Sequence, residues 1–136
     1  MSPNKKEHPG GVCPCGKAAP QALGAFSRGK KCIEKEDYDS AINEFTEAIR
    51  LDPDYAEAYL QRGFLYRMAK NKETLADKDF TMTIKLTTDA ITVDPSDAKA
   101  YIDRGDAYTM LFQYDLAMKD LNEAIKLDPT KVNQGK

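Results

Sequence analysis

The sequence predicts an all-α fold made of three helical hairpins that repeat along the chain. A first phrase, Ala-Ile-x-Leu/Val-Asp-Pro, occurs three times and ends at Pro53, Pro95 and Pro129. A second phrase, Arg-Gly, precedes each of these and occurs at Arg28–Gly29, Arg62–Gly63 and Arg104–Gly105. Two phrases that recur together in the same order indicate internal repeats.

The spacing of these phrases identifies the type of repeat, because Pro95 and Pro129 are 34 residues apart. Tyrosines flank the Arg-Gly phrase in two of the units, at Tyr59, Tyr66, Tyr101 and Tyr108. An alanine followed four residues later by a large apolar residue then marks each second helix, at Ala41, Ala76 and Ala117. This pattern resembles the tetratricopeptide repeat, a 34-residue helix–turn–helix unit.

The resemblance covers about residues 22–130 and divides them into units 22–55, 56–97 and 98–130. It implies a right-handed superhelix, an α-solenoid, in which the first helix of each unit lines a concave face. The residues before it, 1–21, are rich in proline and glycine, so we expect a flexible tail there. We expect residues 131–136 to form a disordered end.

In the first unit, Ala25 and Cys32 occupy the two aromatic positions, so its first helix is expected to pack least well. The turn at residues 36–40 supplies capping groups for a second helix that starts near Ser40. Glycine inside each first helix costs about 1 kcal/mol against alanine, so we expect the marker alanine of the second helix to approach it closely. Each second helix should end at its Asp-Pro phrase, because the residue before proline avoids the α region.

The middle unit is longer, with 42 residues between Pro53 and Pro95. The spacing places one extra residue in the turn 69–74 and seven in the second helix. Seven residues are close to two helical turns, so the buried face continues through the extension. Residues 81–87 alternate like a strand, but an isolated strand would lack a partner, so we predict one extended helix. A break near residues 87–89 is the alternative.

In the third unit, the last helix presents Ala117, Leu121, Ala124 and Ile125 on one face. The eight residues that follow, 129–136, are too short for the helix that usually caps such an array. We therefore interpret this face as a surface for a second copy, or the chain as a fragment of a longer array.

Arginine occupies the position of the family's leucine in all three units, at Arg28, Arg62 and Arg104. We interpret these side chains as structural, with stems that pack and heads that reach water or a neighbouring acid. A row of ligand-binding arginines is the alternative.

Length, composition and charge exclude several classes of protein. The chain has 136 residues, of which 20 are basic and 22 acidic. No apolar run approaches the roughly 20 residues that cross a bilayer, and no basic block is suited to nucleic acid. Three cysteines cannot complete a disulfide framework and favour a reducing compartment, so we expect a cytoplasmic protein.

The cysteines are the only candidates for a metal site. Cys13 and Cys15 resemble the opening of a small zinc-binding motif found in proteins related to the secretion ATPase, and His8 and Cys32 are ligands of suitable type. The second half of that motif is missing, and Cys32 falls on a buried helical face. We therefore predict no bound metal and no cofactor.

Nothing in the sequence supports catalysis. The single histidine lies in the tail, and no glycine-rich phosphate-binding phrase is present. The acidic pairs at turns, Glu36–Asp37 and Asp52 with Asp54, are interpreted as solvated helix caps. We therefore predict a protein that is not an enzyme.

Helical periodicity maps a set of candidate peptide-binding residues onto the concave face implied by the resemblance. They are Phe26, Lys30, Ile33, Leu60, Phe64, Arg67, Lys99, Ile102, Asp106 and Met110, and the same mapping includes Leu23 and Glu57. Phe26, Leu60 and Ile102 form an apolar central row with charged edges. We expect Leu60→Glu or Phe64→Glu to abolish partner binding while leaving the fold largely intact.

One subgroup of the family binds the C-terminal carboxylate of chaperones through lysine, asparagine and arginine side chains. The corresponding residues here are Phe26, Lys30, Gln61, Lys99 and Asp103. Only Lys99 matches outright, and Asp103 has the wrong charge for an anion, so we do not favour this mode of binding.

The sequence as a whole predicts a scaffold for protein–protein interaction that binds a peptide or partner helix in the concave groove of its repeats. A self-associating module, with a homodimer formed through the last helix, is the alternative. Neither nucleic acid nor a membrane is expected as a partner.

Overall fold

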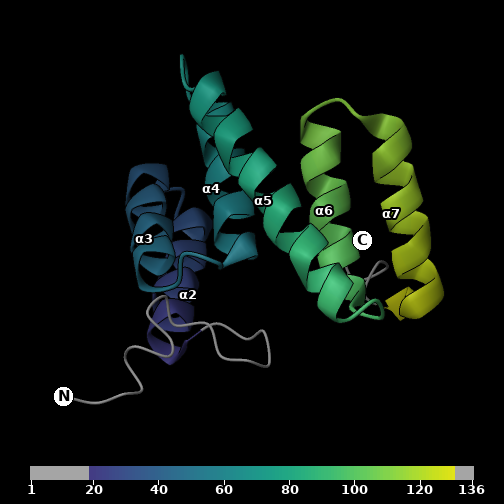
Figure 1. The fold of residues 1–136 in the computed structure, drawn as a ribbon. Helices are drawn as coiled ribbons and strands as arrows, with labels where there is room; N and C mark the ends of the chain where they lie inside the picture. Colours follow the sequence, from purple (N-terminus) through teal and green to yellow (C-terminus); the bar gives the residue numbers. More distant parts are fainter. Residues whose placement is uncertain (1–18, 131–136) are drawn as a thin grey trace.

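The computed structural model describes residues 19–130, which form six α-helices and no strand (Figure 1). The helices are α2 (Pro20–Glu34), α3 (Tyr38–Leu51), α4 (Ala56–Met68), α5 (Glu73–Val93), α6 (Ala98–Met110) and α7 (Tyr114–Leu127). The predicted all-α class is therefore the observed one. Most of the expected tail, the expected disordered end, and the residues His8, Cys13 and Cys15 lie outside the described residues.

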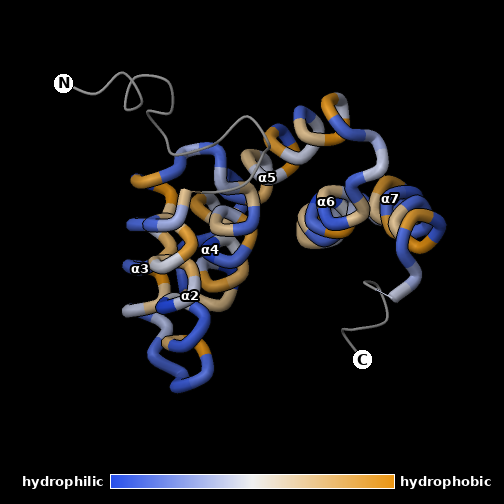
Figure 2. Tube along the Cα trace, turned by 90° about the horizontal axis from the view of Figure 1, so that it is seen from below, coloured by the Kyte–Doolittle hydropathy of each residue, from blue (hydrophilic) through white to orange (hydrophobic). Residues whose placement is uncertain are grey.

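The helices form three hairpins, α2 with α3, α4 with α5, and α6 with α7. Successive hairpins pack through α3 against α4 and through α5 against α6, so the first and third hairpins lie at opposite ends of the array (Figure 1). Hydrophobic and hydrophilic segments alternate along each helix (Figure 2), as expected when one stripe of a helix is buried. The architecture is a helical repeat solenoid.

The helix ends follow from aspartates at the turns. The Asp37 carboxylate accepts a hydrogen bond from the Ser40 amide at 3.2 Å, so α3 begins at Tyr38, two residues before Ser40, near which the start was predicted. Asp97 caps α6 in the same way, by accepting from the Ala100 amide. Each second helix ends on the residue before its Asp-Pro phrase. The short side-chain acceptor thus satisfies amides that the first helical turn leaves unpaired.

The second helix of the middle hairpin, α5, is one continuous helix of 21 residues, against 14 in α3 and in α7. Its buried threonines are compatible with a helix because their hydroxyls donate hydrogen bonds to backbone carbonyls one turn earlier in the same helix. Thr83 donates to the Asp79 carbonyl at 3.0 Å, and Thr87 donates to the Thr83 carbonyl at 2.6 Å. Both side chains can therefore be buried without losing a hydrogen bond. None of the helices within residues 19–130 is both long and apolar enough to cross a membrane.

The glycines of the first helices make room for large side chains of the second helices, and the nearest neighbours of Gly29 and Gly63 are phenylalanine rings rather than the marker alanines expected to approach them closely. A Cβ atom on Gly29 would lie 2.7 Å from the Phe45 ring, and one on Gly63 would lie 2.7 Å from the Phe80 ring. Both rings are fully buried. The marker alanines are buried too, but the phenylalanine four residues later reaches the glycine because side chains four apart share a helix face.

The first hairpin is closed despite its small residues at the aromatic positions. Ala25 is fully buried, and the Phe26 ring lies 5.3 Å from the Phe45 ring and 5.0 Å from the Tyr55 ring. Cys32 is half-buried against this cluster and carries a free thiol. The prediction that the first helix of this unit packs least well is therefore not supported by its hydrophobic core.

Candidate functional site

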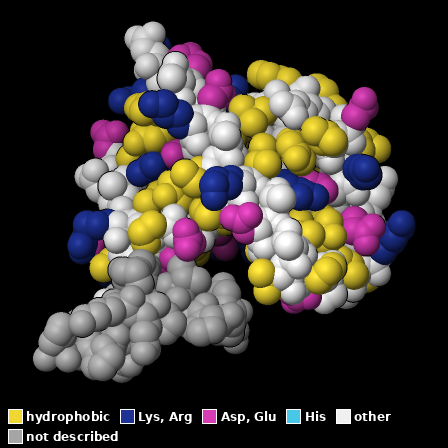
Figure 3. Space-filling model, in the orientation of Figure 1, with side chains coloured by type: hydrophobic (Ala, Val, Ile, Leu, Met, Phe, Trp, Pro, Cys, Tyr) yellow, Lys and Arg dark blue, Asp and Glu magenta, His cyan; other side chains and the backbone are white. Residues whose placement is uncertain are grey.

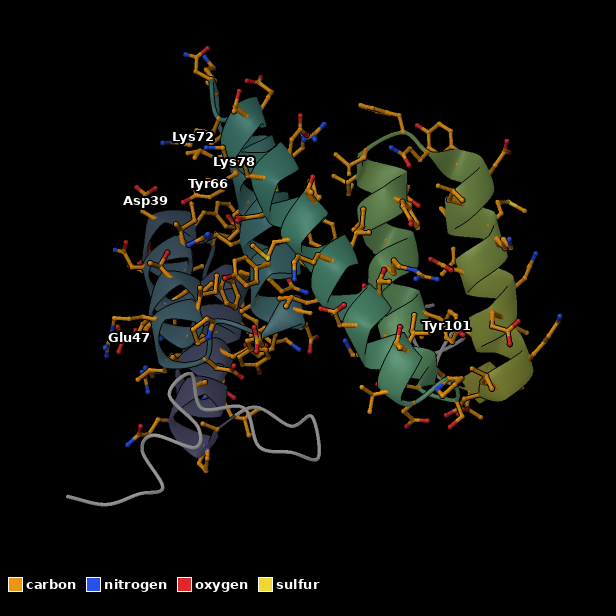
Figure 4. All side chains as sticks on the ribbon, in the orientation of Figure 1. Asp39, Glu47, Tyr66, Lys72, Lys78 and Tyr101 are labelled. Atoms are coloured by element: carbon orange, nitrogen blue, oxygen red, sulfur yellow. The ribbon has the colours of Figure 1, made fainter. Side chains whose placement is uncertain are left out.

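Two of the three arginines, Arg62 and Arg104, pair with an aspartate of their own hairpin and donate a further hydrogen bond to a threonine of the preceding one. Arg62 donates two hydrogen bonds to Asp79, both 2.9 Å long, and Arg104 donates two to Asp120 of 2.7 and 2.8 Å. Two tyrosine rings lie close to each guanidinium, with centroids 5.5 to 6.0 Å away; Tyr101, one of them, lies between α6 and α7 (Figure 4). These arginines are structural, as predicted, because their donors are directed at buried carboxylates.

The structure buries two of the residues predicted to form the apolar centre of the groove. Phe26 is 7% exposed and Leu60 is 2% exposed, and each belongs to a hydrophobic core cluster. Phe64 is half-buried, with its ring 5.7 Å from that of Phe80. The prediction that Leu60→Glu leaves the fold intact is therefore wrong, because it would place a charge in the core.

The other predicted groove residues remain at least partly accessible. Lys30 is exposed, with its ammonium 5.7 Å from the centre of the Phe26 ring. The half-buried ones are Ile33, Phe64, Arg67, Lys99, Ile102, Asp106 and Met110. Arg67 pairs with Asp77 and lies over the Phe80 ring, so it too serves the packing of the middle hairpin. Ile102 is half-buried and belongs to neither core cluster.

A pocket of about 350 Å³ draws its lining from all three repeats. Its walls include apolar side chains from α2, the α3–α4 turn and α5, namely Leu23, Tyr55, Leu86 and Ala90. Its charged residues are Lys99 and five acids: Asp52, Asp54, Glu57, Asp97 and Asp103. Elsewhere on the surface, too, side chains of opposite charge lie together among hydrophobic ones (Figure 3).

Within this pocket, Lys99 bridges two repeats. Its ammonium lies 2.8 and 2.9 Å from the two carboxylate oxygens of Asp103 on its own helix, and 3.2 Å from an oxygen of Glu57 on α4. Burial acts to lower the pKa of Lys99, but these carboxylates outweigh it and raise the pKa. Burial raises the pKa of Asp103 to about 7, although Lys99 opposes this change.

Asp52 is the most deeply buried acid of the pocket and is 1% exposed. Its carboxylate accepts a hydrogen bond from the Asp54 amide at 3.1 Å, and burial raises its pKa to about 6. The interpretation of Asp52 as a solvated cap is therefore wrong. The acidic pair does lie at a turn, but Asp52 is buried there, whereas Pro53 and Asp54 are exposed.

Comparisons of the chain with family models and with solved structures agree with one another. The family model described as "TPR repeat" matches residues 29–68, and the model described as "Tetratricopeptide repeat" matches residues 98–131. The chain belongs to the tetratricopeptide repeat family. The two matched segments cover parts of the first and second hairpins and the whole of the third.

Solved tetratricopeptide structures share this fold. The first such domain of Spaghetti (RPAP3), bound to the HSP90 peptide SRMEEVD, is 27% identical with a TM-score of 0.55, over 85% of this chain and 92% of that one. The second domain of human RPAP3, in complex with the HSP70 peptide SGPTIEEVD, is 28% identical with a TM-score of 0.51, over 80% and 84%. The Arabidopsis OM64 domain is 26% identical with a TM-score of 0.52, over 81% and 84%.

The tetratricopeptide pattern placed Leu23, Glu57 and Lys99 on the concave face but missed most of the other pocket residues. Asp52 belongs to the helix-ending phrase, where an aspartate has a structural role in every repeat. Leu86 lies in the threonine-rich extension of α5, between Phe80 and Ala90, which has no counterpart in the other repeats. The length of the middle repeat was the available signal, because extra turns of a second helix add side chains that pack against neighbouring elements.

The predicted face of α7 also needs correction. Ala117 and Ala124 are buried, and Leu121 is half-buried beside Gly105 of α6. Ile125 is exposed as predicted, and the other exposed apolar residues of α7 are Tyr114, Leu116 and Met118. Ala117, Leu121 and Ala124 do not form an exposed face, because α6, the first helix of the same hairpin, already covers them.

Proposed function

We propose that this tetratricopeptide chain is a non-enzymatic interaction module that binds a peptide or partner helix on the concave side of α2, α4 and α6. The family is a protein-interaction fold, and relatives of the same fold have been solved with peptides bound. The observation that carries the proposal is the pocket lined by residues of all three repeats. A ligand that crosses the repeats would contact this pocket together with Ile102.

Several further features belong to the same proposal. We propose repeat units at residues 22–55, 56–97 and 98–130, which place each helical hairpin in one unit apart from the first two residues of α2. We propose that the chain acts by binding and catalyses no reaction. Its arginines and most of its buried acidic side chains stabilise the packing of the helices or line the pocket, so we do not interpret them as catalytic groups. A cytoplasmic location is proposed from the odd number of cysteines, of which Cys32 carries a free thiol.

Binding of a chaperone carboxylate, as in the solved RPAP3 complexes, is less well supported. Lys99 is the only cation at the corresponding positions of α6, and its charge is already neutralised by Asp103 and Glu57. An incoming carboxylate would have to displace both acids and would meet the other acids of the pocket.

Peptide selection from a random library, followed by affinity measurement, tests the groove. Peptides selected on the unaltered protein should bind Ile102→Glu at least about tenfold more weakly, since a charge replaces a central apolar contact. The matched control is Val93→Glu, which makes the same type of change at an exposed residue that belongs neither to the pocket nor to the predicted groove. Equal binding by both variants would place the ligand elsewhere and contradict the proposal.

A second candidate function, self-association, rests on the exposed side of α7. Ile42 and Ile49 of α3 are half-buried, whereas the corresponding residues of α7, Met118 and Ile125, are exposed. Burying this face would be favourable by about 25 cal/mol per Å² before the cost of association. Analytical ultracentrifugation should show a dimer that Met118→Glu dissociates, and a monomer at all concentrations would exclude it.

A further inference from the structure

The charges of the pocket do not balance. Five carboxylates face one ammonium, that of Lys99, and Lys99 pairs with only two of them, Asp103 and Glu57. Within residues 19–130 no ion pair is formed by the other three, Asp52, Asp54 and Asp97. Asp97 has a separate role, since it caps α6. The excess negative charge is therefore concentrated at Asp52 and Asp54.

Asp52 is unusual among the three aspartates that end the second helices. Asp94, at the same position of the middle repeat, is exposed and accepts hydrogen bonds from both the amide and the hydroxyl of Ser96. Asp52 is almost completely buried, and one amide is the only donor that the described residues direct at its carboxylate. A buried carboxylate is costly unless a cation or several donors accompany it. This one lines a pocket that is open to a ligand.

The apolar walls suit a particular shape of cation. Leu23, Tyr55 and Leu86 line the same pocket as the two unpaired acids. Lysine and arginine side chains have an aliphatic stem and a charged head, so they can satisfy both parts at once. The volume of about 350 Å³ lies at the small end of the range for ligand sites, which fits a side chain better than a whole cofactor.

A metal ion is a less suitable occupant. The described residues contain no group of three histidine, cysteine, aspartate or glutamate side chains placed to hold a metal. The pocket instead already holds an ammonium group, that of Lys99, at hydrogen-bond distances from two carboxylates. Its chemistry is therefore that of a site for organic cations.

We propose that this pocket, as part of the binding surface proposed above, receives a lysine or arginine side chain of the partner. The stem of that side chain lies against Leu23, Tyr55 and Leu86, and its head pairs with Asp52 and Asp54. The charge preference is thus opposite to that of relatives solved with EEVD-ending peptides. The site selects a basic peptide, and Lys99 holds the adjacent acids in place.

Titration of the isotopically labelled chain with end-blocked tripeptides tests the charge preference. The probes are Gly-Arg-Gly, Gly-Glu-Gly and Gly-Leu-Gly, each added to about 10 mM, so that binding with a Kd as weak as about 1 mM approaches saturation. The arginine probe should shift the backbone amide signals of Asp54, Glu57 and Leu86, and the shifts should weaken with added salt. The glutamate probe should leave these signals unchanged.

Two matched variants assign the effect to Asp52. Asp52→Asn keeps the acceptor of its turn but removes the charge, and should raise the Kd of the arginine probe by about 3- to 10-fold. Asp94→Asn makes the same change at the exposed counterpart and should leave the Kd unaltered. If Asp52→Asn fails to fold, Asp54→Asn provides the same test from the exposed side of the pocket.

The outcomes separate this inference from the function on which it rests. If the leucine probe shifts concave-face signals but arginine gains nothing over glutamate, the charge preference is refuted and peptide binding stands. If the glutamate probe binds at Lys99, the pocket selects anions and the inference is overturned. If selected peptides bind the unaltered protein and lose nothing on Ile102→Glu, the proposed function itself fails.

Discussion

The recurring arginine is enclosed in the second and third hairpins but open to solvent in the first. The side chain of Arg62 is 16% exposed, pairs with Asp79 and lies close to two tyrosine rings, and Arg104 has the same kind of surroundings. The side chain of Arg28 is 57% exposed and makes one hydrogen bond of 3.0 Å, to Glu44. The same residue type at the same position therefore has two energetic roles.

The difference lies in the neighbours and not in the arginine. In the first hairpin Ala25 and Cys32 replace the two tyrosines, and Glu44 replaces the shorter aspartate. Without rings to cover it, the guanidinium stays in water, where an ion pair contributes little. A repeated residue thus shows the position of a repeat, while its surroundings decide whether it stabilises the fold.

Removing the enclosed arginine should have the largest effect. Arg62→Ala leaves Asp79 buried without its partner and should lower the free energy of unfolding by about 3 kcal/mol. Arg28→Ala should lower it by less than about 1 kcal/mol, because that pair is exposed. Urea unfolding followed by circular dichroism measures both. Equal losses would show that burial does not distinguish the two arginines.

A double variant controls for the origin of that loss. Replacing both Arg62 and Asp79 by leucine should recover most of the stability, since no unpaired charge remains in the hairpin. Persistence of the full loss would instead assign it to the missing contacts between the guanidinium and the tyrosine rings.

The glycines extend the comparison to the helix–helix contact. Gly63→Ala should destabilise by about 1–2 kcal/mol, because its Cβ would meet the fully buried Phe80 ring and must displace it. Gly105→Ala should be nearly neutral. Its Cβ would lie 3.1 Å from Leu121, a half-buried side chain that can turn away, and alanine favours the helix by about 1 kcal/mol. Thermal unfolding of the two variants measures this difference.

Variants at the Asp-Pro turns of the first two hairpins, Asp52→Asn and Asp94→Asn, should differ less in stability, and their difference should depend on pH. Burial raises the pKa of Asp52 to about 6, so the folded state binds the proton more tightly than the unfolded state. The contribution of this carboxyl group to stability should then be lost as the pH rises from about 4 to about 7. Asp52→Asn should be more stable than the unaltered protein at pH 7, by roughly 1–2 kcal/mol after allowance for screening, and equal at pH 4.

Asp94→Asn should show the opposite sign. Hydrogen bonds from Ser96 lower the pKa of Asp94, so its contribution to stability is present at neutral pH and is lost as the pH falls through that pKa. Urea unfolding at several pH values compares the two variants. Parallel pH profiles for both would contradict the assigned burial of Asp52.

The sequence predicted the fold well because its signals are local. Alanine spacing and Asp-Pro phrases report on single helices, and the acid partners of Arg62 and Arg104 lie on the adjoining helix of the same hairpin. The candidate site was predicted less well because it depends on contacts between hairpins. Helical periodicity places Leu60 on the concave side, but only the packing of neighbouring repeats shows that it is covered. The burial of Asp52 likewise depends on distant elements that meet at one turn.

The length of α5 shows how a repeat protein can gain a binding site without losing its fold. Seven residues advance a helix by about 10 Å but rotate it only about 20° short of two full turns, so the buried stripe continues almost in phase. An insertion of five or six residues would instead turn the stripe away from its neighbours. Here the added turns contain Leu86 and Thr87, which form part of the pocket wall. Indels of one heptad are therefore a route by which a regular array acquires an irregular surface, and with it the means to discriminate between partners.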